Sequence, residues 1–313
     1  MPPVIYWLVT SGMGANDGKV CRVTPAGDAD IIIDSLPSFF NVATNAVDGA
    51  LGAWLADDGI IYVMQGGGPD PLSSSILQFS WEDYLTKGSP LLPQERNSAI
   101  MVGEWALANG YIESNPYSSF RQETGDLIIA DAAANAVFRY HVNGDSLSVV
   151  ADMPSTPNPT PIGPPFIEPV PSKVLPAPDG NGFLVATYTG FPFPDGEAKI
   201  YRISEEGDIS IYLEGLTQAI DFAPNPANDD LFILQFARFG PDPDGNLNYL
   251  FGSAQLLSAD AEGNLDTIAS GFGPSAGLAV LPDGSVYTWS VLLKGWLLIS
   301  TCISKLAFLL WAS

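Results

Sequence analysis

The chain has 313 residues and a formal net charge of −23, from 12 basic and 35 acidic side chains. Nucleic acid and anionic lipid are both bound through basic surfaces, so this charge argues against either as a partner. Apolar residues make up 46% of the chain, which is ample for a core, and 31 glycines and 27 prolines indicate many tight turns.

A unit of short strands and turns recurs along the chain. In its clearest copy, SNPYSSF leads to the strands LIIAD, AVFRYH and SLSVVA, which are separated by turns. We expect repeats near 4–36, 40–81, 114–152, 170–216, 218–272 and 274–290. Four short strands per repeat are typical of a propeller blade. The sequence therefore predicts an all-β, six-bladed β-propeller with incomplete first and last blades, in a single domain at 1–290.

Two segments interrupt the repeats. An insertion at 82–113 follows the second repeat, with short helices expected near Trp81–Thr86 and Glu104–Asn109. A proline-rich connector at 153–171 follows the third, and its prolines exclude it from a central strand.

Both ends depart from the repeat. IYWLVT and GKVCRV match the second and third strands of later repeats, so the first strand of the first blade is missing. No basic segment precedes the short apolar run at the start, so a signal peptide is not expected within this chain. The tail at 291–313 is apolar and has no acidic residue. It is a membrane-spanning helix, the last outer strands, or a sequence foreign to the domain.

The chain has few residues suited to metal or disulfide chemistry. Cys21 and Cys302 lie near opposite ends, and either pair where the ends of a closed propeller meet or are separate thiols. His141, the single histidine, follows Tyr140 on a predicted strand. One histidine argues against a multi-histidine metal site and against a Ser-His-Asp triad.

Polar residues occur near the predicted start of several innermost strands. They are Asn41, Asn115, Ser172, Gln218, Asp221 and Ser275. The innermost strands of a propeller line its channel, so we expect these residues to form a ring. One interpretation is a ligand site at the channel mouth. The other is that they satisfy backbone groups at strand ends and hold channel water.

Two further patterns have alternative interpretations. Phe191 and Phe193 lie between prolines in an inter-strand loop, where they either stack on a flat ligand or pack against the neighbouring blade. Acidic and amide residues alternate at 242–246 and at 260–266. This alternation resembles part of a calcium loop, but its positions favour hairpin turns.

The segments TGFPFPDGEAKIYRI at 189–203 and SNPY at 114–117 resemble the ScyD/ScyE family. This family is named for proteins of scytonemin biosynthesis in cyanobacteria, and the resemblance extends over about 18–288. It implies an NHL-like or lactonase-like six-bladed propeller that is exported to the periplasm or beyond. The missing first strand and the unrelated tail depart from the family pattern, and the resemblance assigns no reaction.

Three functions remain open from the sequence. The first is an exported binding or accessory protein for a small aromatic metabolite or a partner protein, in the biosynthesis of a scytonemin-like pigment. The second is a metal-assisted, lactonase-like hydrolase with a Ca²⁺ site at the channel mouth. The lactonase-like resemblance implies this site, with Asp221 and Asn115 as oxygen ligands of the ion. The third is a protein-interaction scaffold, so whether the chain is an enzyme is left open.

Overall fold

The computed structural model describes residues 6–24, 28–42, 46–290 and 299–302. The chain divides into two compact units, Met1–Val149 and Val150–Ser313, each of which is described by itself. The single domain expected at 1–290 stays a prediction. Among the described residues, no helix is both long and apolar enough to cross a membrane.

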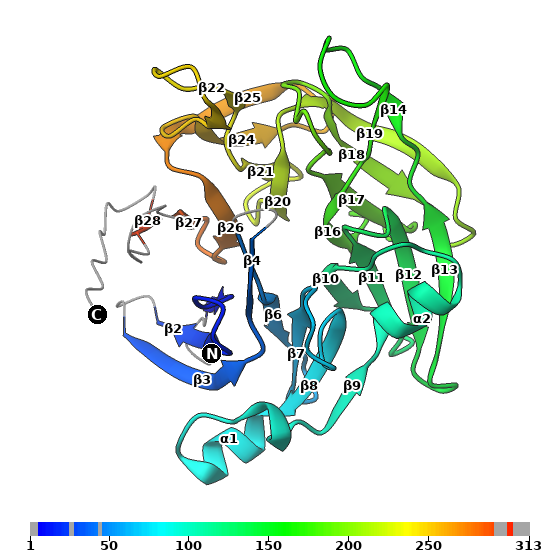
Figure 1. The fold of residues 1–313 in the computed structure, drawn as a ribbon, viewed down its shortest axis with the longest axis vertical. Helices are drawn as coiled ribbons and strands as arrows, with labels where there is room; N and C mark the ends of the chain where they lie inside the picture. The colour runs from blue at the N-terminus through cyan, green and yellow to red at the C-terminus, as the bar shows by residue number, and fades with distance from the viewer. Residues whose placement is uncertain (1–5, 25–27, 43–45, 291–298, 303–313) are drawn as a thin grey trace. The chain divides into compact units, whose positions relative to one another are not determined.

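The first unit contains three antiparallel sheets that follow one another along the chain (Figure 1). The first consists of β1 (Tyr6–Thr10), β2 (Gly18–Val23) and β3 (Ala29–Leu36). The second consists of β6 (Ala50–Leu55), β7 (Ile60–Gln65), β8 (Ser75–Ser80) and β9 (Ser98–Ile100). The third consists of β10 (Pro116–Arg121), β11 (Leu127–Asp131), β12 (Ala136–His141) and β13 (Ser146–Asp152), and the boundary of the unit after Val149 falls within β13. A hairpin of β4 (Phe39–Asn41) and β5 (Ala46–Asp48) precedes β6.

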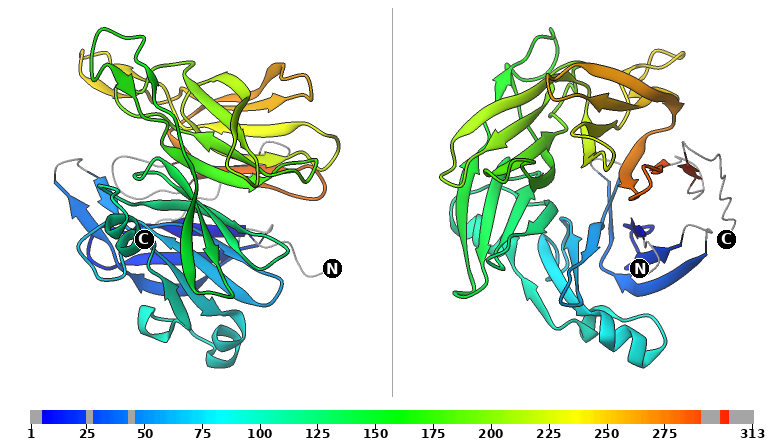
Figure 2. Two further views of the ribbon diagram at one scale, coloured as in Figure 1. Left: turned by 90° about the vertical axis from the view of Figure 1, so that its right-hand side faces the viewer. Right: turned by 180° about the vertical axis from the view of Figure 1, so that it is seen from behind.

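The second unit also contains three larger sheets, which Figure 2 shows from two further sides. One consists of β16 (Pro171–Pro176), β17 (Phe183–Thr187), β18 (Ala198–Ile203) and β19 (Ile209–Leu216). The next consists of β20 (Ala219–Pro224), β21 (Leu231–Gln235), β24 (Ala254–Ala259) and β25 (Leu265–Phe272). The last consists of β26 (Ser275–Val280), β27 (Val286–Ser290) and β28 (Ile299–Cys302). Two hairpins are added by β14 (Thr156–Pro157) with β15 (Phe166–Ile167), and by β22 (Phe239–Pro241) with β23 (Leu247–Tyr249).

The first sheet has three strands among the described residues, where the sequence predicted a missing first strand. Pairing of β2 with β3 shifts register at the same two places as pairing of β18 with β19. Therefore β1, β2 and β3 correspond to the second, third and fourth strands of the complete sheets. No strand precedes β1 in the part of the chain that the structure describes.

The insertion in the first unit contains the two short helices expected there, α1 (Trp81–Lys87) and α2 (Val102–Ala108). A 3₁₀ turn, Pro93–Glu95, and strand β9 lie between them. Helix α1 begins where the Ser80 hydroxyl accepts a hydrogen bond from the Asp83 amide. It ends at Gly88, whose φ of 66° is a left-handed conformation that favours glycine.

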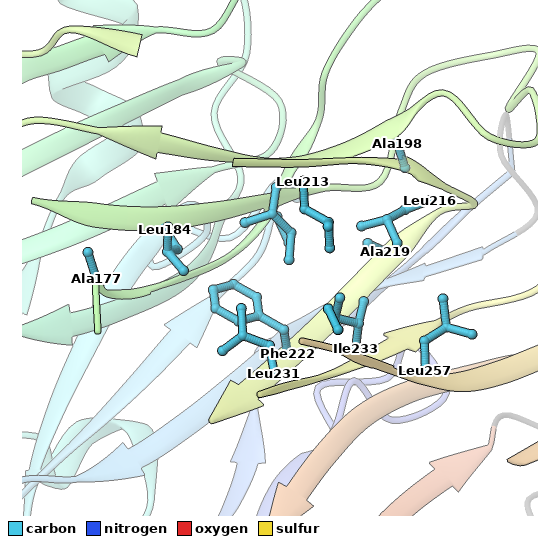
Figure 3. Close-up of a cluster of buried hydrophobic side chains, with 13 residues drawn as sticks. Ala177, Leu184, Ala198, Leu213, Leu216, Ala219, Phe222, Leu231, Ile233 and Leu257 are labelled. Carbon is cyan, nitrogen blue, oxygen red and sulfur yellow. The ribbon is translucent and has the colours of Figure 1, made fainter. Parts of the chain in front are cut away.

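The cores lie between successive sheets of each unit. The second strands β11, β17 and β21 are buried at every residue. Figure 3 shows one such core in the second unit, where Leu184 packs near Phe222 and Ile233 from the next sheet. Ile200 belongs to the same cluster. Burial on both faces explains why these strands read as continuous aliphatic runs.

Most of the apolar tail lies outside the described residues. Residues 299–302 form β28, which pairs with β27 and extends the last sheet. The rest of the segment 291–313, and with it the choice between a membrane helix and another role, lies outside the described part. The side chain of Cys302 also lies outside it, so the pairing with Cys21 stays a prediction.

Candidate functional site

A β-bulge fixes the repeat position of side chains at the start of the inner strands. In β6, β10, β16, β20 and β26, the register shifts after the first residue, so the second residue is an extra one. The first residues are Ala50, Pro116, Pro171, Ala219 and Ser275. Across this point, successive side chains therefore do not alternate regularly between the two faces of the strand.

The polar residues expected in one ring occupy several different repeat positions. Ser275 is the first residue of its strand, and Ser172 is a bulged residue. Asn115 and Gln218 precede their strands, whereas Asp221 follows the bulge. They therefore do not present equivalent groups to a common ligand.

Three of these residues in the second unit are buried and bind backbone groups. The Ser172 hydroxyl donates to the carbonyl of Ala219, at 2.6 Å, and so joins consecutive inner strands. The Ser275 hydroxyl donates to the Gly273 carbonyl at 2.9 Å. Gln218 is fully buried, and its side-chain amide donates to the Phe193 carbonyl at 3.4 Å, while its side-chain oxygen is without a hydrogen-bond partner among the described residues. These contacts favour the interpretation in which the residues satisfy the backbone.

Asp221 is held by the two neighbouring inner strands. Its Oδ1 lies 2.9 Å from Lys173 Nζ on β16, and its Oδ2 accepts a hydrogen bond of 3.0 Å from the Leu278 amide on β26. The residue is only 9% exposed. Both carboxylate oxygens thus have protein partners. The Lys173 ammonium group neutralises the negative charge that would otherwise attract a metal cation.

Asn41 and Asn115 belong to the first unit, whereas Asp221 and its partners belong to the second. Asn41 is on β4 rather than at the start of the inner strand β6, and its amide donates to Asp48 Oδ2 at 3.1 Å. Asn115 Oδ1 accepts a hydrogen bond of 3.3 Å from the Gly67 amide. Asn115 and Asp221, the two proposed Ca²⁺ ligands, belong to different units.

A second set of polar residues was missed in the sequence. Each is the last residue of a second strand, pairs with the first residue of its inner strand, and is buried: Gln65, Asp131, Thr187 and Gln235. Asp131 accepts from the Asn115 amide at 2.7 Å, and Gln235 accepts from the Thr217 amide at 2.5 Å. These two residues thus bind the segment that leads into the inner strand. The sequence does contain a pattern that indicates this set, because a polar residue ends the aliphatic stretch of each of these second strands.

Phe191 and Phe193 belong to an aromatic cluster in the second unit. The cluster joins the β17–β18 loop to the segment between β21 and β24, and consists of Tyr188, Phe191, Phe193, Phe236, Phe239 and Tyr249. The Phe193 ring lies 5.1 Å from Phe239 and 5.7 Å from Tyr249, measured between centroids. Phe193 therefore packs on the neighbouring sheet's loop, while Phe191 is 44% exposed.

A pocket of about 390 Å³ lies in the first unit, between the β1–β2 turn, the β3–β4 link and the β7–β8 loop. Its lining includes Asn16, Ser38, Phe39, Gly67, Asp70 and Ser73. The volume is within the range of small-molecule sites. No motif in the sequence indicated it, because its walls come from three separate loops.

One wall of the pocket is fixed through Asp17. Its carboxylate accepts hydrogen bonds from the amides of Met13 and Ala15 and from the Ser38 hydroxyl, at 2.8, 3.2 and 2.9 Å. Burial raises the pKa of Asp17, but these hydrogen bonds outweigh it and leave the pKa below its ordinary value. The charged carboxylate therefore holds the turn against the β3–β4 link.

The opposite wall is fixed to the segment before β10. Asn115 binds the Gly67 amide, and the Ser74 hydroxyl donates to the Ser114 carbonyl at 2.6 Å. Gly66 donates its amide to the Gly49 carbonyl at 2.8 Å. Both walls are thus held by the protein's own hydrogen bonds, so the pocket does not depend on a ligand to form.

The pocket lining exposes more polar than apolar surface, and it includes one aromatic ring and one carboxylate. Phe39 exposes 40% of its surface, and prolines contribute much of the remaining apolar lining. Among the described residues that line the pocket, only Asp70 is ionisable. One of its oxygens accepts from the Leu72 amide at 2.8 Å. A flat, neutral or cationic molecule suits these groups, whereas an anion would be repelled.

The alternating acidic segments form turns. Asp242 Oδ1 accepts hydrogen bonds from the amides of Asp244 and Asn246, in the turn between β22 and β23. Asp260 binds the amides of Glu262 and Asn264 in the same way. In the part of the chain that the structure describes, no three His, Cys, Asp or Glu residues are grouped to hold a metal.

His141 lies between an acid and a hydroxyl, an arrangement that the sequence argued against. Its Nδ1 lies 3.3 Å from Asp126 Oδ2, and its Nε2 lies 2.9 Å from Ser148 Oγ. The pairing of Leu127 with Tyr140 brings Asp126 beside His141. Only strand register reveals this, because the three residues follow no recognised sequence motif.

Comparison with known proteins identifies the architecture. No family model and no curated protein matches the chain. A chain of a nidogen–laminin complex superposes with a TM-score of 0.59 at 10% identity, covering 96% of this chain and 90% of that one. The chain has the β-propeller fold. This confirms the predicted all-β propeller class, with six sheets of three or four strands among the described residues.

Two further solved propellers are similar to this chain. TolB from Acinetobacter baumannii has a TM-score of 0.55 at 12% identity, covering 96% of this chain and 60% of its own. A gluconolactonase from Xanthomonas campestris has a TM-score of 0.52 at 12% identity, covering 86% of this chain and 75% of its own. At such identities, the likeness concerns the fold.

Proposed function

We propose that this propeller is a binding protein whose ligand is a small, flat, neutral or cationic molecule held in the pocket of the first unit. The observation that carries the proposal is the preformed pocket with the exposed Phe39 ring and the Asp70 carboxylate in its lining. An aromatic face supplies a stacking surface, and a carboxylate beside it favours a positive charge or a hydrogen-bond donor.

The resemblance to the ScyD/ScyE family supports a more specific form of the proposal. In that form the protein is exported to the periplasm or beyond and assists the biosynthesis of a scytonemin-like pigment. An aromatic metabolite of that kind is flat and carries hydrogen-bond donors, which suits Phe39 and Asp70. A partner protein that covers the same loops is the alternative occupant.

The test compares ligands that share a ring and differ in charge. Titration calorimetry should show that tryptamine binds more tightly than indole-3-acetate. Phe39→Ala should weaken tryptamine binding roughly two- to five-fold, as expected for loss of an exposed cation–π contact. Asp70→Asn should reduce the preference for the cation. Leu107→Ala, at an exposed position on α2, is the matched control and should leave binding unchanged.

Equal affinity for the two ligands, or an unchanged affinity in Phe39→Ala, would contradict the proposal. The hydrolase alternative makes a different prediction, because it needs Asp221 as a Ca²⁺ ligand. With Lys173 and Leu278 occupying that carboxylate, we expect Ca²⁺ to leave the melting temperature unchanged. A rise on adding Ca²⁺ that is lost in Asp221→Asn would favour the hydrolase.

A further inference from the structure

We propose that Ser148, His141 and Asp126 form a second site, on the outer strands of the third sheet, in which Ser148 is the nucleophile for small carboxylic esters. The site lies within the first unit and is independent of the pocket. The proposal rests on the geometry of these three side chains, which come from three consecutive segments of one sheet.

The distances suit transfer of a proton from serine to histidine. Ser148 Oγ lies 2.9 Å from His141 Nε2, within the range for a nucleophile and its general base. On the other side of the ring, Nδ1 lies 3.3 Å from Asp126 Oδ2. A carboxylate there favours the tautomer with a proton on Nδ1, which leaves Nε2 free to accept.

Asp126 is itself held in place. Its Oδ1 accepts a hydrogen bond of 3.1 Å from the Val142 amide, and its side chain is 18% exposed. The carboxylate therefore cannot turn freely away from the imidazole. This gives Asp126 the positioning and charge-stabilising role that the acid has in serine hydrolases.

The surroundings are open to a substrate. The His141 side chain is 40% exposed, and Ser148 is half-buried on β13. Strand β13 is the outermost of its sheet, so its outer edge has no strand partner among the described residues.

The proposed reaction has two steps, acylation of Ser148 and hydrolysis of the acyl-serine. Ser148 Oγ bonds to the ester carbonyl carbon while its proton moves to His141 Nε2. That proton then passes to the departing alkoxide, which leaves as an alcohol and gives an acyl-serine. Water attacks the acyl-serine with His141 again as base, which releases the carboxylic acid and restores the serine hydroxyl.

The chemistry of the site selects a substrate class. An open site offers no deep pocket for a long acyl chain, so a small ester with a good leaving group is favoured. A formal net charge of −23 repels anionic esters. Small neutral or cationic esters are therefore the expected substrates.

The test uses the whole chain with p-nitrophenyl acetate, followed by mass spectrometry of the acetylated protein. We expect hydrolysis with an acetyl group on the peptide that contains Ser148. Ser148→Ala should abolish that label and slow hydrolysis at least roughly ten-fold. His141→Gln should do the same, since general-base catalysis contributes on the order of 10²–10⁴ in rate. Asp126→Asn should slow the reaction but keep the label on Ser148.

The control is Ser146→Ala, on the same strand and exposed, which should leave rate and label unchanged. Circular dichroism and melting of each variant separate loss of fold from loss of chemistry. The proposal is overturned if folded Ser148→Ala hydrolyses the ester at the original rate. An acetyl group found on His141 or on a lysine, and never on Ser148, overturns it equally.

Discussion

Lys173 and Asp221 occupy the same position of consecutive repeats and carry opposite charges that meet at 2.9 Å. In three other sheets, the residue after the bulge is uncharged: Gly52, Ser118 and Gly277. The ion pair is therefore a property of two neighbouring blades. It joins β16 to β20, and the Leu278 amide extends the link to β26.

Breaking this pair should destabilise the protein. Lys173→Met leaves the buried Asp221 carboxylate without its cation and should lower the free energy of unfolding by about 1–3 kcal/mol. The double variant Lys173→Met/Asp221→Asn should recover part of that loss, because the unpaired charge is removed. Urea denaturation of the single and double variants measures the coupling. Strictly additive losses would show that the two groups do not interact.

Asp131 should be critical for the segment that enters β10. Asp131→Ala removes the acceptor for the Ser114 hydroxyl and for the amides of Asn115 and Ala134. We expect a loss of at least about 2 kcal/mol, because several buried donors lose their partner. Asp131→Asn keeps an acceptor and should cost less. Since Asn115 positions Gly67, the alanine variant should also weaken ligand binding in the pocket.

Phe191 and Phe193 should differ in their effect on stability. Phe193 is half-buried among four aromatic neighbours, so Phe193→Ala should cost about 2–3 kcal/mol, somewhat below the value for a fully buried ring. Phe191 is 44% exposed, and Phe191→Ala should cost less than about 1 kcal/mol. Chemical denaturation compares the two variants. Equal losses would place Phe191 inside the cluster.

Asp179 should respond to pH through Arg202. Its hydrogen bond to the Arg202 guanidinium, helped by the Asn181 amide, lowers the pKa of Asp179 from 3.8 to about 2. Because the folded-state pKa is depressed, the contribution to stability is present above the unfolded pKa and is lost as pH falls from about 4 to about 2. Arg202→Gln should raise the pKa toward 3.8, as followed by NMR titration of the carboxyl carbon. An unchanged titration would show that the guanidinium does not hold this carboxylate in solution.

The sequence predicted the strands better than the relations between them. Second strands such as Phe183–Thr187 are aliphatic because both faces are buried, so their composition alone identified them. The second repeat was expected to open near Phe40, but its inner strand begins at Ala50, after the hairpin of β4 and β5. Both segments have strand-forming residues, and composition does not show which strand pairs with which.

The candidate sites were harder to predict for the same reason. Side chains near the start of an inner strand were aligned by their sequence spacing, which the bulge interrupts between Ala219 and Asp221. Asp126, His141 and Ser148 come together only through strand register. The pocket depends on three loops whose meeting is set by the packing of sheets. Such relations are tertiary, and local patterns of polarity do not contain them.

The bulge at the start of the inner strands also bears on the origin of the repeat. The extra residue at this point of the five sheets varies from aliphatic to aromatic to polar: Leu51, Tyr117, Ser172, Ile220 and Ala276. A bulge is retained within families of proteins even when the residue that forms it changes. Repeated duplication of an ancestral segment that already had the bulge is a simple account of the five copies, since the bulge then has to arise only once. In that account the five sheets share the backbone irregularity although the side chain at that position differs.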